Sequence, residues 1–271
     1  MIDELGQHEA FDLPDNRLLN FPASGDFRCV ASTVATDWHF MGDTKVVGYR
    51  FRNEDGTVAD NITDWALAQF DGNYRPKGHR YKKDERKIDK DAIFHYVYAV
   101  LHDPVYRDKY AQNLKREFPR IPFYGQSLDD FFRWADAGTE LMRLHIGYEQ
   151  VQPWPLSRVD LVDEKARSTG QTPKPSLKAD KEHGRIVLDS ETTLTSVPRE
   201  AWEYKLGNRS ALEWILDQYK ESKPKDPTIR EKFDTYRFAD HKEHVIDLLM
   251  RVTRVSVETQ RIVDAMAKWL R

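Results

Sequence analysis

The chain has 271 residues, of which 39% are hydrophobic, 12% aromatic and 32% charged, so it is able to bury a substantial core. Its formal net charge of −3 argues against a protein that coats nucleic acid through bulk electrostatics, but it leaves room for a local basic face. One cysteine, Cys29, excludes an internal disulfide framework, and no stretch reaches the roughly 18 apolar residues that a membrane span needs. The start at Met1 also lacks the basic and apolar run of a signal peptide, so we expect a cytoplasmic protein without membrane contact.

The N-terminal part predicts β structure between residues 17 and 60, after a polar and acidic stretch at 1–16. Runs of β-branched and aromatic residues there are separated by the turn-forming pairs Gly25-Asp26 and Gly42-Asp43. Asn61 or Thr63 is suited to cap a short helix that follows.

A basic loop, residues 75–90, is predicted next. It contains eight basic residues against three acids, with tyrosines interleaved; the basic residues are Arg75, Lys77, Arg80, Lys82, Lys83, Arg86, Lys87 and Lys90. Two interpretations stay open: a solvated connection between helices, or a loop that contacts phosphate groups.

Helical spacing predicts three helices, over 91–102, from Pro104 to about 118, and from Ser127 to Gly147. The proline-rich 118–124 segment between them is expected to be extended and packed. Residues 150–182 are rich in proline, lysine, aspartate and serine without periodicity, which predicts a surface loop or linker.

Strands are predicted at 185–188 and 192–197, followed by a turn at Gly207-Asn208 and a helix with a capping box formed by Ser210 and Glu213. Lys205 and Arg209 stand just before this helix, where an anion such as phosphate would gain from the helix dipole and from both cations. The simpler alternative is a well-capped core helix with solvated basic neighbours. A long helix is predicted from about 240 to 270.

Together these elements predict an α+β protein, predominantly helical, with a small and mostly antiparallel sheet built from 17–51 and 185–197. We treat residues 1–271 as a single domain. Its predicted parts are β-rich at 17–60, helical at 61–149, a loop or linker at 150–182, and a strand pair with C-terminal helices at 183–271.

Several short motifs, in order over roughly residues 28–266, resemble the C-terminal specificity domain of type ISP restriction–modification enzymes. The motifs are Ile62–Leu67, Asp91–Pro104, Phe118–Tyr124, Leu144–Tyr148, Gly184–Ser190, the 197–219 stretch and Tyr236–Phe238. Type ISP proteins are much larger, so the resemblance implies an N-terminally truncated specificity domain: a cloned fragment, a split-gene product or a remnant.

The resemblance implies double-stranded DNA as the partner and a role in target recognition during phage defence. The candidates for phosphate contact are Arg75, Lys77, Arg80, Lys82, Lys83, Lys205, Arg209 and Ser210. The candidates for reading base edges are Arg28, Asp37, His39, Lys45 and Asn208, because comparable strand-and-loop regions read bases in related proteins and a side-chain amide can pair with adenine.

Catalytic motifs are not recognisable in the sequence. It has no phosphate-binding loop, dinucleotide-binding glycine motif, adenine-methyltransferase Asn-Pro-Pro-Tyr or hydrolase nucleophile elbow. The pair His241 and His244 has no third ligand nearby, and a carboxylate cluster near Asp160 lies in the aperiodic linker. We therefore expect a non-catalytic chain without a cofactor.

S-adenosylmethionine, ATP and Mg²⁺ are implied only for methyltransferase, helicase and nuclease modules that act in cis or in trans, in a bacterium or archaeon. The alternative hypothesis is a helical protein-interaction module that docks a methyltransferase or helicase.

Overall fold

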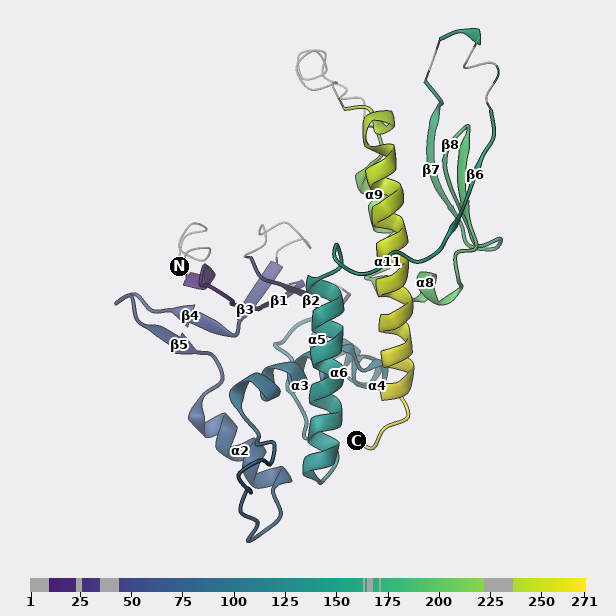
Figure 1. Cartoon of the computed structure of the whole chain (residues 1–271). Helices are drawn as coiled ribbons and strands as arrows, with labels where there is room; N and C mark the ends of the chain where they lie inside the picture. Colours follow the sequence, from purple (N-terminus) through teal and green to yellow (C-terminus); the bar gives the residue numbers. More distant parts are fainter. Residues whose placement is uncertain are drawn as a thin grey trace. The chain divides into compact units, whose positions relative to one another are not determined.

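The structure is a computed structural model that describes residues 10–22, 26–34, 44–162, 164, 168–170, 172–221 and 236–271. Its contacts divide the chain into two compact units, unit 1 (1–147 and 261–271) and unit 2 (148–260), where the sequence had predicted one domain. Helices and small antiparallel sheets occur in both units, which confirms the predicted α+β class. Figure 1 shows the elements in chain order.

Unit 1 starts with two small antiparallel sheets, one with strand order β2-β1-β3 and one formed by the β4-β5 hairpin. The strands are β1 (Leu18–Pro22), β2 (Val30–Ser32), β3 (Thr44–Gly48), β4 (Arg50–Arg52) and β5 (Val58–Asp60). Every residue of the central strand β1 is buried. These strands confirm the β structure predicted for this part of the chain.

The helices of unit 1 mostly begin where the sequence predicted. They are α2 (Asp64–Tyr74), α3 (Lys90–His102), α4 (Pro104–Lys109), α5 (Ala111–Leu114) and α6 (Leu128–Ile146). Thr63 and Asp89 cap α2 and α3 through their side-chain oxygens, and Ser127 forms a capping box with Asp130 at the start of α6.

The helix predicted from 104 to about 118 is broken. It ends as α4 at Lys109, and a single turn, α5, follows. Tyr110 between them has φ −108° and ψ 18°, outside the helical region, although its N–H still donates to the Tyr106 carbonyl at 3.0 Å.

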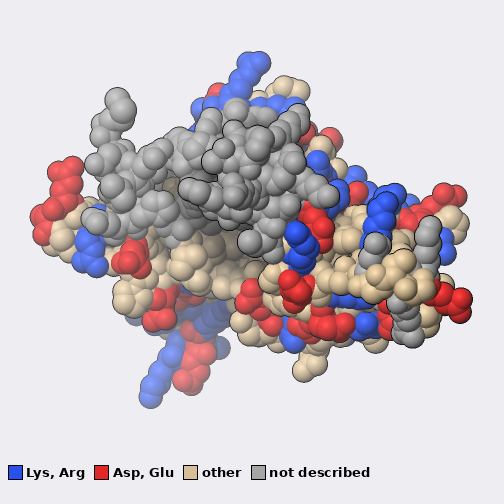
Figure 2. All heavy atoms as spheres, turned by 90° about the horizontal axis from the view of Figure 1, so that it is seen from above, with Lys and Arg blue, Asp and Glu red and all other residues tan. Residues whose placement is uncertain are grey.

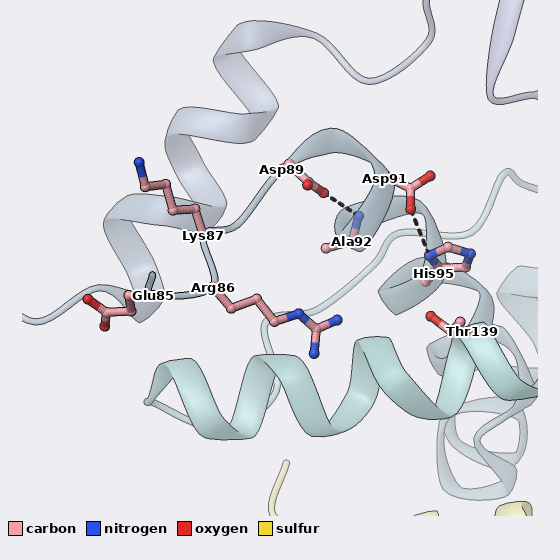
Figure 3. Close-up of a pocket in the computed structure, with 8 residues that line it drawn as sticks. All are labelled: Glu85, Arg86, Lys87, Asp89, Asp91, Ala92, His95 and Thr139. Atoms are coloured by element: carbon pink, nitrogen blue, oxygen red, sulfur yellow. Dashed lines mark hydrogen bonds and ion pairs between the residues drawn. The ribbon is translucent and has the colours of Figure 1, made fainter. Parts of the chain in front are cut away.

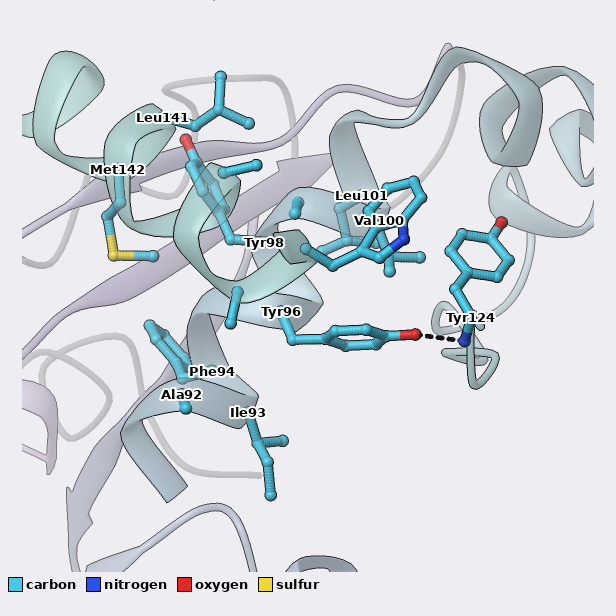
Figure 4. Close-up of a cluster of buried hydrophobic side chains, with 14 of the residues drawn as sticks. Ala92, Ile93, Phe94, Tyr96, Tyr98, Val100, Leu101, Tyr124, Leu141 and Met142 are labelled. Carbon is cyan, nitrogen blue, oxygen red and sulfur yellow. Dashed lines mark hydrogen bonds between the residues drawn. The ribbon is translucent and has the colours of Figure 1, made fainter. Parts of the chain in front are cut away.

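The core of unit 1 is aromatic and lies around α3 and α6. Tyr96 of α3 stacks on Phe131 of α6 with ring centroids 5.3 Å apart. The Tyr96 hydroxyl donates to the Pro122 carbonyl at 2.8 Å and accepts the backbone N–H of Tyr124 at 2.7 Å, as Figure 4 shows for the second bond. The 118–124 segment is therefore an extended connection tied into the core, as predicted.

The described part of unit 2 contains a four-stranded antiparallel sheet of order β6-β9-β8-β7, a short hairpin, the short helices α8 and α9, and most of the long helix α11 (Phe238–Met266). The strands are β6 (Ser157–Asp160), β7 (Pro175–Asp180), β8 (Arg185–Asp189), β9 (Thr192–Thr195), β10 (Lys205–Leu206) and β11 (Arg209–Ser210), and the short helices are α8 (Glu200–Glu203) and α9 (Ala211–Gln218). The two strand groups predicted as one sheet thus belong to separate sheets in separate units.

The segment 150–182, predicted as a loop or linker, contains β6 and β7. Among the described residues both are edge strands that pair on one side only, β6 with β9 and β7 with β8. All four residues of β6 are exposed, so this strand has no apolar alternation from which it is recognisable in the sequence.

The long C-terminal helix α11 (Phe238–Met266) confirms the predicted element. Its first part packs in unit 2, where Val245 and Leu249 are buried, and the residues from 261 onward belong to unit 1. Among the described residues, no helix combines the length and the apolar character that crossing a membrane requires.

Candidate nucleic-acid interface

The basic loop joins α2 to α3 and has neither helix nor strand between residues 75 and 89. Three of its cations are held by acids of neighbouring elements. Arg75 pairs with Asp71 at 2.7 Å, Arg86 with Asp136 at 2.6 Å, and Lys90 with both Asp60 at 3.0 Å and Asp64 at 2.8 Å. These ion pairs fix the two ends of the loop, and they neutralise the positive charges of Arg75, Arg86 and Lys90.

The middle of the basic loop presents unpaired cations. Lys77, Arg80, Lys82 and Lys83 are exposed and make no ion pair with any residue that the structure describes. Lys87 is exposed as well, and its ammonium lies 6.0 Å from the centre of the Tyr81 ring. Of the five predicted phosphate contacts in this loop, Arg75 is therefore engaged in an ion pair with Asp71. The other four are exposed and able to contact a phosphate.

Side chains within the loop hold its shape. The Tyr81 hydroxyl donates to Asp71 at 2.7 Å, and the backbone N–H of Lys82 donates to Glu85 at 2.9 Å. Burial, reinforced by the hydrogen bond to Asp71, raises the pKa of Tyr81 to about 12, so the hydroxyl stays protonated and keeps donating. The free cations thus project from a braced segment, which lowers the entropic cost of contacting a charged surface.

An open hollow of about 480 Å³ lies beside the end of this loop, at the start of α3 (Figure 3). Its walls carry both signs of charge, because Arg86 and Lys87 line it together with Asp89 and Asp91. Deeper in, the Nε2 atom of His95 lies 2.9 Å from an Arg17 guanidinium nitrogen.

Because arginine only donates, Nε2 must accept, which puts the His95 proton on Nδ1 near Asp91. Burial lowers the pKa of His95, in agreement with this neutral form. Mixed charge and a neutral histidine give the hollow no preference for an anion.

A second exposed basic feature is the β10-β11 hairpin of unit 2. Its two-residue turn has Gly207 at φ +74°, a conformation that suits glycine, and places Asn208 at the exposed tip. The Trp214 indole donates to the Leu206 carbonyl at 3.0 Å, and Arg209 pairs with Asp217 at 2.7 Å, so helix α9 braces the hairpin. Lys205 is exposed and makes no ion pair within the described part of the chain.

The start of α9 is already occupied by the protein's own carboxylate. Glu213 accepts the backbone N–H of Ser210 at 2.9 Å and its hydroxyl at 2.8 Å, and Lys181 pairs with the same oxygen at 2.9 Å. Ser210 is fully buried. The predicted capping box is confirmed, whereas the predicted anion position at this helix end is filled by Glu213, so Ser210 is not available for a phosphate.

The predicted base-reading residues that the structure describes are divided between the two units. Asp37 and His39 lie outside the described residues. Arg28 is half-buried in unit 1, and Lys45 on β3 places its ammonium 4.8 Å from the Phe118 ring centre, whereas Asn208 belongs to unit 2.

Sequence reasoning missed an open groove of about 900 Å³ beside β3, partly lined by Lys45. It also missed the division of the basic loop into held and free cations. Asp136, the partner of Arg86, is distant in sequence, so no local pattern indicated the pair.

The surface charges are mixed. On the face shown in Figure 2, blue Lys and Arg side chains are interspersed with red Asp and Glu side chains over the described atoms, in keeping with the net charge of −3. Within the described ranges, no three His, Cys, Asp or Glu side chains gather as a metal site.

Comparison with known proteins connects these features to one family. The family model of the type ISP C-terminal specificity domain matches residues 10–248. A cryo-EM structure of a DrdV–DNA complex is similar over 94% of this chain, with 45% sequence identity and a TM-score of 0.82. The comparison with curated proteins returned no match.

Two further solved structures share the fold over 94% of the chain. One is a nuclease-deletion mutant of the type ISP restriction–modification enzyme LlaGI in complex with a DNA substrate mimic, at 24% identity and a TM-score of 0.65. The other is the ATP-dependent type ISP enzyme LlaBIII bound to DNA, at 20% identity and a TM-score of 0.69. The match covers 25%, 21% and 16% of the DrdV, LlaGI and LlaBIII chains, respectively.

Proposed function

The chain belongs to the type ISP C-terminal specificity domains, and from this membership we propose that it recognises a target sequence in double-stranded DNA. The proposal is supported by the basic loop, whose unpaired cations project from a braced segment and suit contact with a phosphate backbone. The DNA-bound state of the 45%-identical relative supports it further.

This proposal involves two kinds of contact with DNA, to phosphates and to base edges. Lys77, Arg80, Lys82 and Lys83 position the duplex by neutralising phosphates, which requires charge but no base-specific geometry. The hairpin tip supplies the geometry that base reading requires, because Asn208 is exposed on a turn braced by α9, and its amide is able to pair with an adenine edge. Lys205 beside it contacts the backbone.

The other predicted base-reading residues, Arg28, Asp37, His39 and Lys45, remain candidates for contact with base edges.

We further propose that the chain is itself non-catalytic and serves a restriction–modification system that defends a bacterial or archaeal cytoplasm against phage DNA. Methylation with S-adenosylmethionine and ATP- and Mg²⁺-dependent translocation and cleavage then belong to methyltransferase, helicase and nuclease modules that act in cis or in trans.

The positioning role is tested by the salt dependence of duplex binding, measured by fluorescence anisotropy between about 50 and 200 mM salt. Lys82→Ala combined with Lys83→Ala is expected to lower affinity and to flatten the log–log salt slope by about 1.8, because each lost phosphate contact removes about 0.9. The control removes two cations elsewhere, Arg120→Ala with Arg199→Ala, both 91% exposed, and is expected to leave the slope nearly unchanged.

Base reading is tested after selecting a preferred target from a random duplex library. Asn208→Ala is expected to reduce discrimination between the selected and a scrambled duplex by about tenfold, at an unchanged salt slope. Salt-insensitive binding by the wild-type chain, or equal slopes for the two double variants, would overturn the positioning assignment. Undiminished discrimination by Asn208→Ala would remove the hairpin from base reading.

A further inference from the structure

An open groove runs beside strand β3 in unit 1, and we call it the β3 groove. It encloses about 900 Å³, and much of its lining is apolar, with the rings of Phe11, Phe51 and Phe118 among its walls. Phe118 is 59% exposed, which is unusual for a large ring at the end of a connection that is otherwise tied into the core. The groove therefore offers apolar surface to a partner.

The outer edge of β3 also offers backbone hydrogen bonds. In the order β2-β1-β3, this strand pairs with β1 alone among the described residues. The Tyr49 N–H donates toward β1, to the Arg17 carbonyl, whereas the Gly48 carbonyl faces the other way and accepts the Asn61 side chain at 3.0 Å. Because successive residues of a strand alternate in direction, the N–H and C=O of Val46 point to the same outer side as the Gly48 carbonyl.

The charges of the groove suit a peptide better than a duplex. Glu54 and Asp55 lie in its lining and would repel phosphates. Of the two lining cations, Arg52 donates to the Gly56 carbonyl at 3.2 Å, and Lys45 rests over the Phe118 ring. An extended polypeptide with apolar side chains and a basic residue complements both the walls and the acids.

The first described residues of unit 1 lie beside this groove. A Cβ on Gly48 would lie 2.5 Å from the Phe11 ring, so Phe11 packs directly over the end of β3. Asn16 is fully buried; its amide donates to the Phe11 carbonyl at 3.0 Å and its oxygen accepts the Arg50 N–H at 3.0 Å. Residues 11–16 are thus held in place next to the groove.

In the family, this domain is C-terminal, and three quarters of the 45%-identical relative lies outside the matched part. Polypeptide that precedes such a domain is joined to it only a few residues before Phe11, because the family match begins at residue 10, so its effective concentration at the groove is high. We propose that the β3 groove binds an extended segment of the preceding type ISP polypeptide, which adds a strand to β3 and places an apolar side chain against Phe118. The inference rests on the proposed role of the chain as one module of a larger type ISP assembly.

The test uses the part of the DrdV relative that lies outside the match, produced as a separate protein, and measures its binding to the full chain by calorimetry. Phe118→Ala, and separately Val46→Pro, which removes the outward N–H, are each expected to weaken binding by at least about tenfold. The matched control is Phe123→Ala, an exposed ring on the same connection that does not line the groove, with an expected change below about twofold.

Duplex binding, measured in parallel, separates this inference from the proposed function. Phe118→Ala is expected to bind DNA within about twofold of wild type. Failure of the wild-type chain to bind the DrdV portion, or binding as tight as wild type by both groove variants, would overturn the inference while leaving DNA recognition intact. A loss of DNA affinity in Phe118→Ala would make the groove a DNA contact instead, and a wild-type dimer that this variant dissociates would make the occupant a second copy.

Discussion

Replacing Gly138 with alanine should destabilise unit 1, because α6 crosses α3 at this residue with no room for a side chain. A Cβ built on Gly138 would lie 1.8 Å from the His95 carbonyl oxygen and 2.6 Å from its carbon. Real Cβ atoms do not come closer than 3.0 Å, so the helix backbones would have to separate locally by about 1.2 Å.

Two opposed effects decide whether Gly138→Ala raises or lowers the free energy of unfolding. Alanine is favoured over glycine in a helix interior by about 1 kcal/mol. Overpacking costs about 1 to 3 kcal/mol or more, and here the obstacle is backbone rather than the flexible end of a side chain, so the upper part of that range applies. We expect Gly138→Ala to lower the free energy of unfolding by about 2 kcal/mol after the propensity gain is subtracted.

Urea unfolding followed by far-UV circular dichroism measures this difference. The matched control is Gly72→Ala in α2, where an added Cβ meets nothing within 4 Å. That variant should gain about 0.5 to 1 kcal/mol from propensity alone. A Gly138→Ala protein as stable as wild type would refute the reasoning, because it would mean that the two helices do not approach as closely as described.

Three further predictions concern buried ionisable groups of unit 1. Burial lowers the pKa of His145 to about 3 and also lowers that of His102, so both are neutral when folded. The unfolded chain binds protons below about pH 6.5, so stability should hold above that pH and fall below it by about 1.4 kcal/mol per histidine per pH unit, measured by urea titrations. Arg271→Ala should cost about 3 kcal/mol by the same method, because it strips the fully buried Asp103 of a partner at 2.6 Å. Burial raises the pKa of Cys29 to about 12, so a disulfide reagent near neutral pH should modify it only in denaturant.

Each of these predictions has an outcome that contradicts it. Stability that is flat down to about pH 5 would show that the two histidines are not buried as neutral groups. For the ion pair, adding Asp103→Asn to Arg271→Ala should recover part of the loss; a double variant that falls further would rule out a stranded carboxylate. Rapid labelling of Cys29 in the native protein would show that its surroundings open readily.

Local signals in the sequence predicted the helices of this fold well. Thr63 and Ser127, both expected at a helix start, each supply a side-chain oxygen to the first turn of the helix that follows, and this chemistry involves neighbouring residues only. The capping box of Ser210 and Glu213 was predictable for the same reason. Its consequence for anion binding was missed, since the first-turn carboxylate that completes the cap also fills the place of an external anion.

Features that depend on distant partners were beyond sequence reasoning. Strands β6 and β7 pair at the edges of a sheet and show little alternation, so hydrophobic pattern did not separate them from a loop. The ion pair of Arg86 could not be predicted, because its partner Asp136 lies beside it in space but not in sequence. The β3 groove requires the juxtaposition of Phe11, Phe51 and Phe118, which no local window contains.

The buried amide of Asn16 has a consequence for chimeric proteins. It ties Phe11 to Arg50 across the entry of the domain, so residues 11–16 act as part of the folded body rather than as a tether. A graft that exchanges specificity modules between polypeptides should therefore place its junction upstream of residue 10, where the family match also begins. A junction inside residues 11–16 would remove the hydrogen bonds of Asn16 to Phe11 and Arg50 and would destabilise the position of β1.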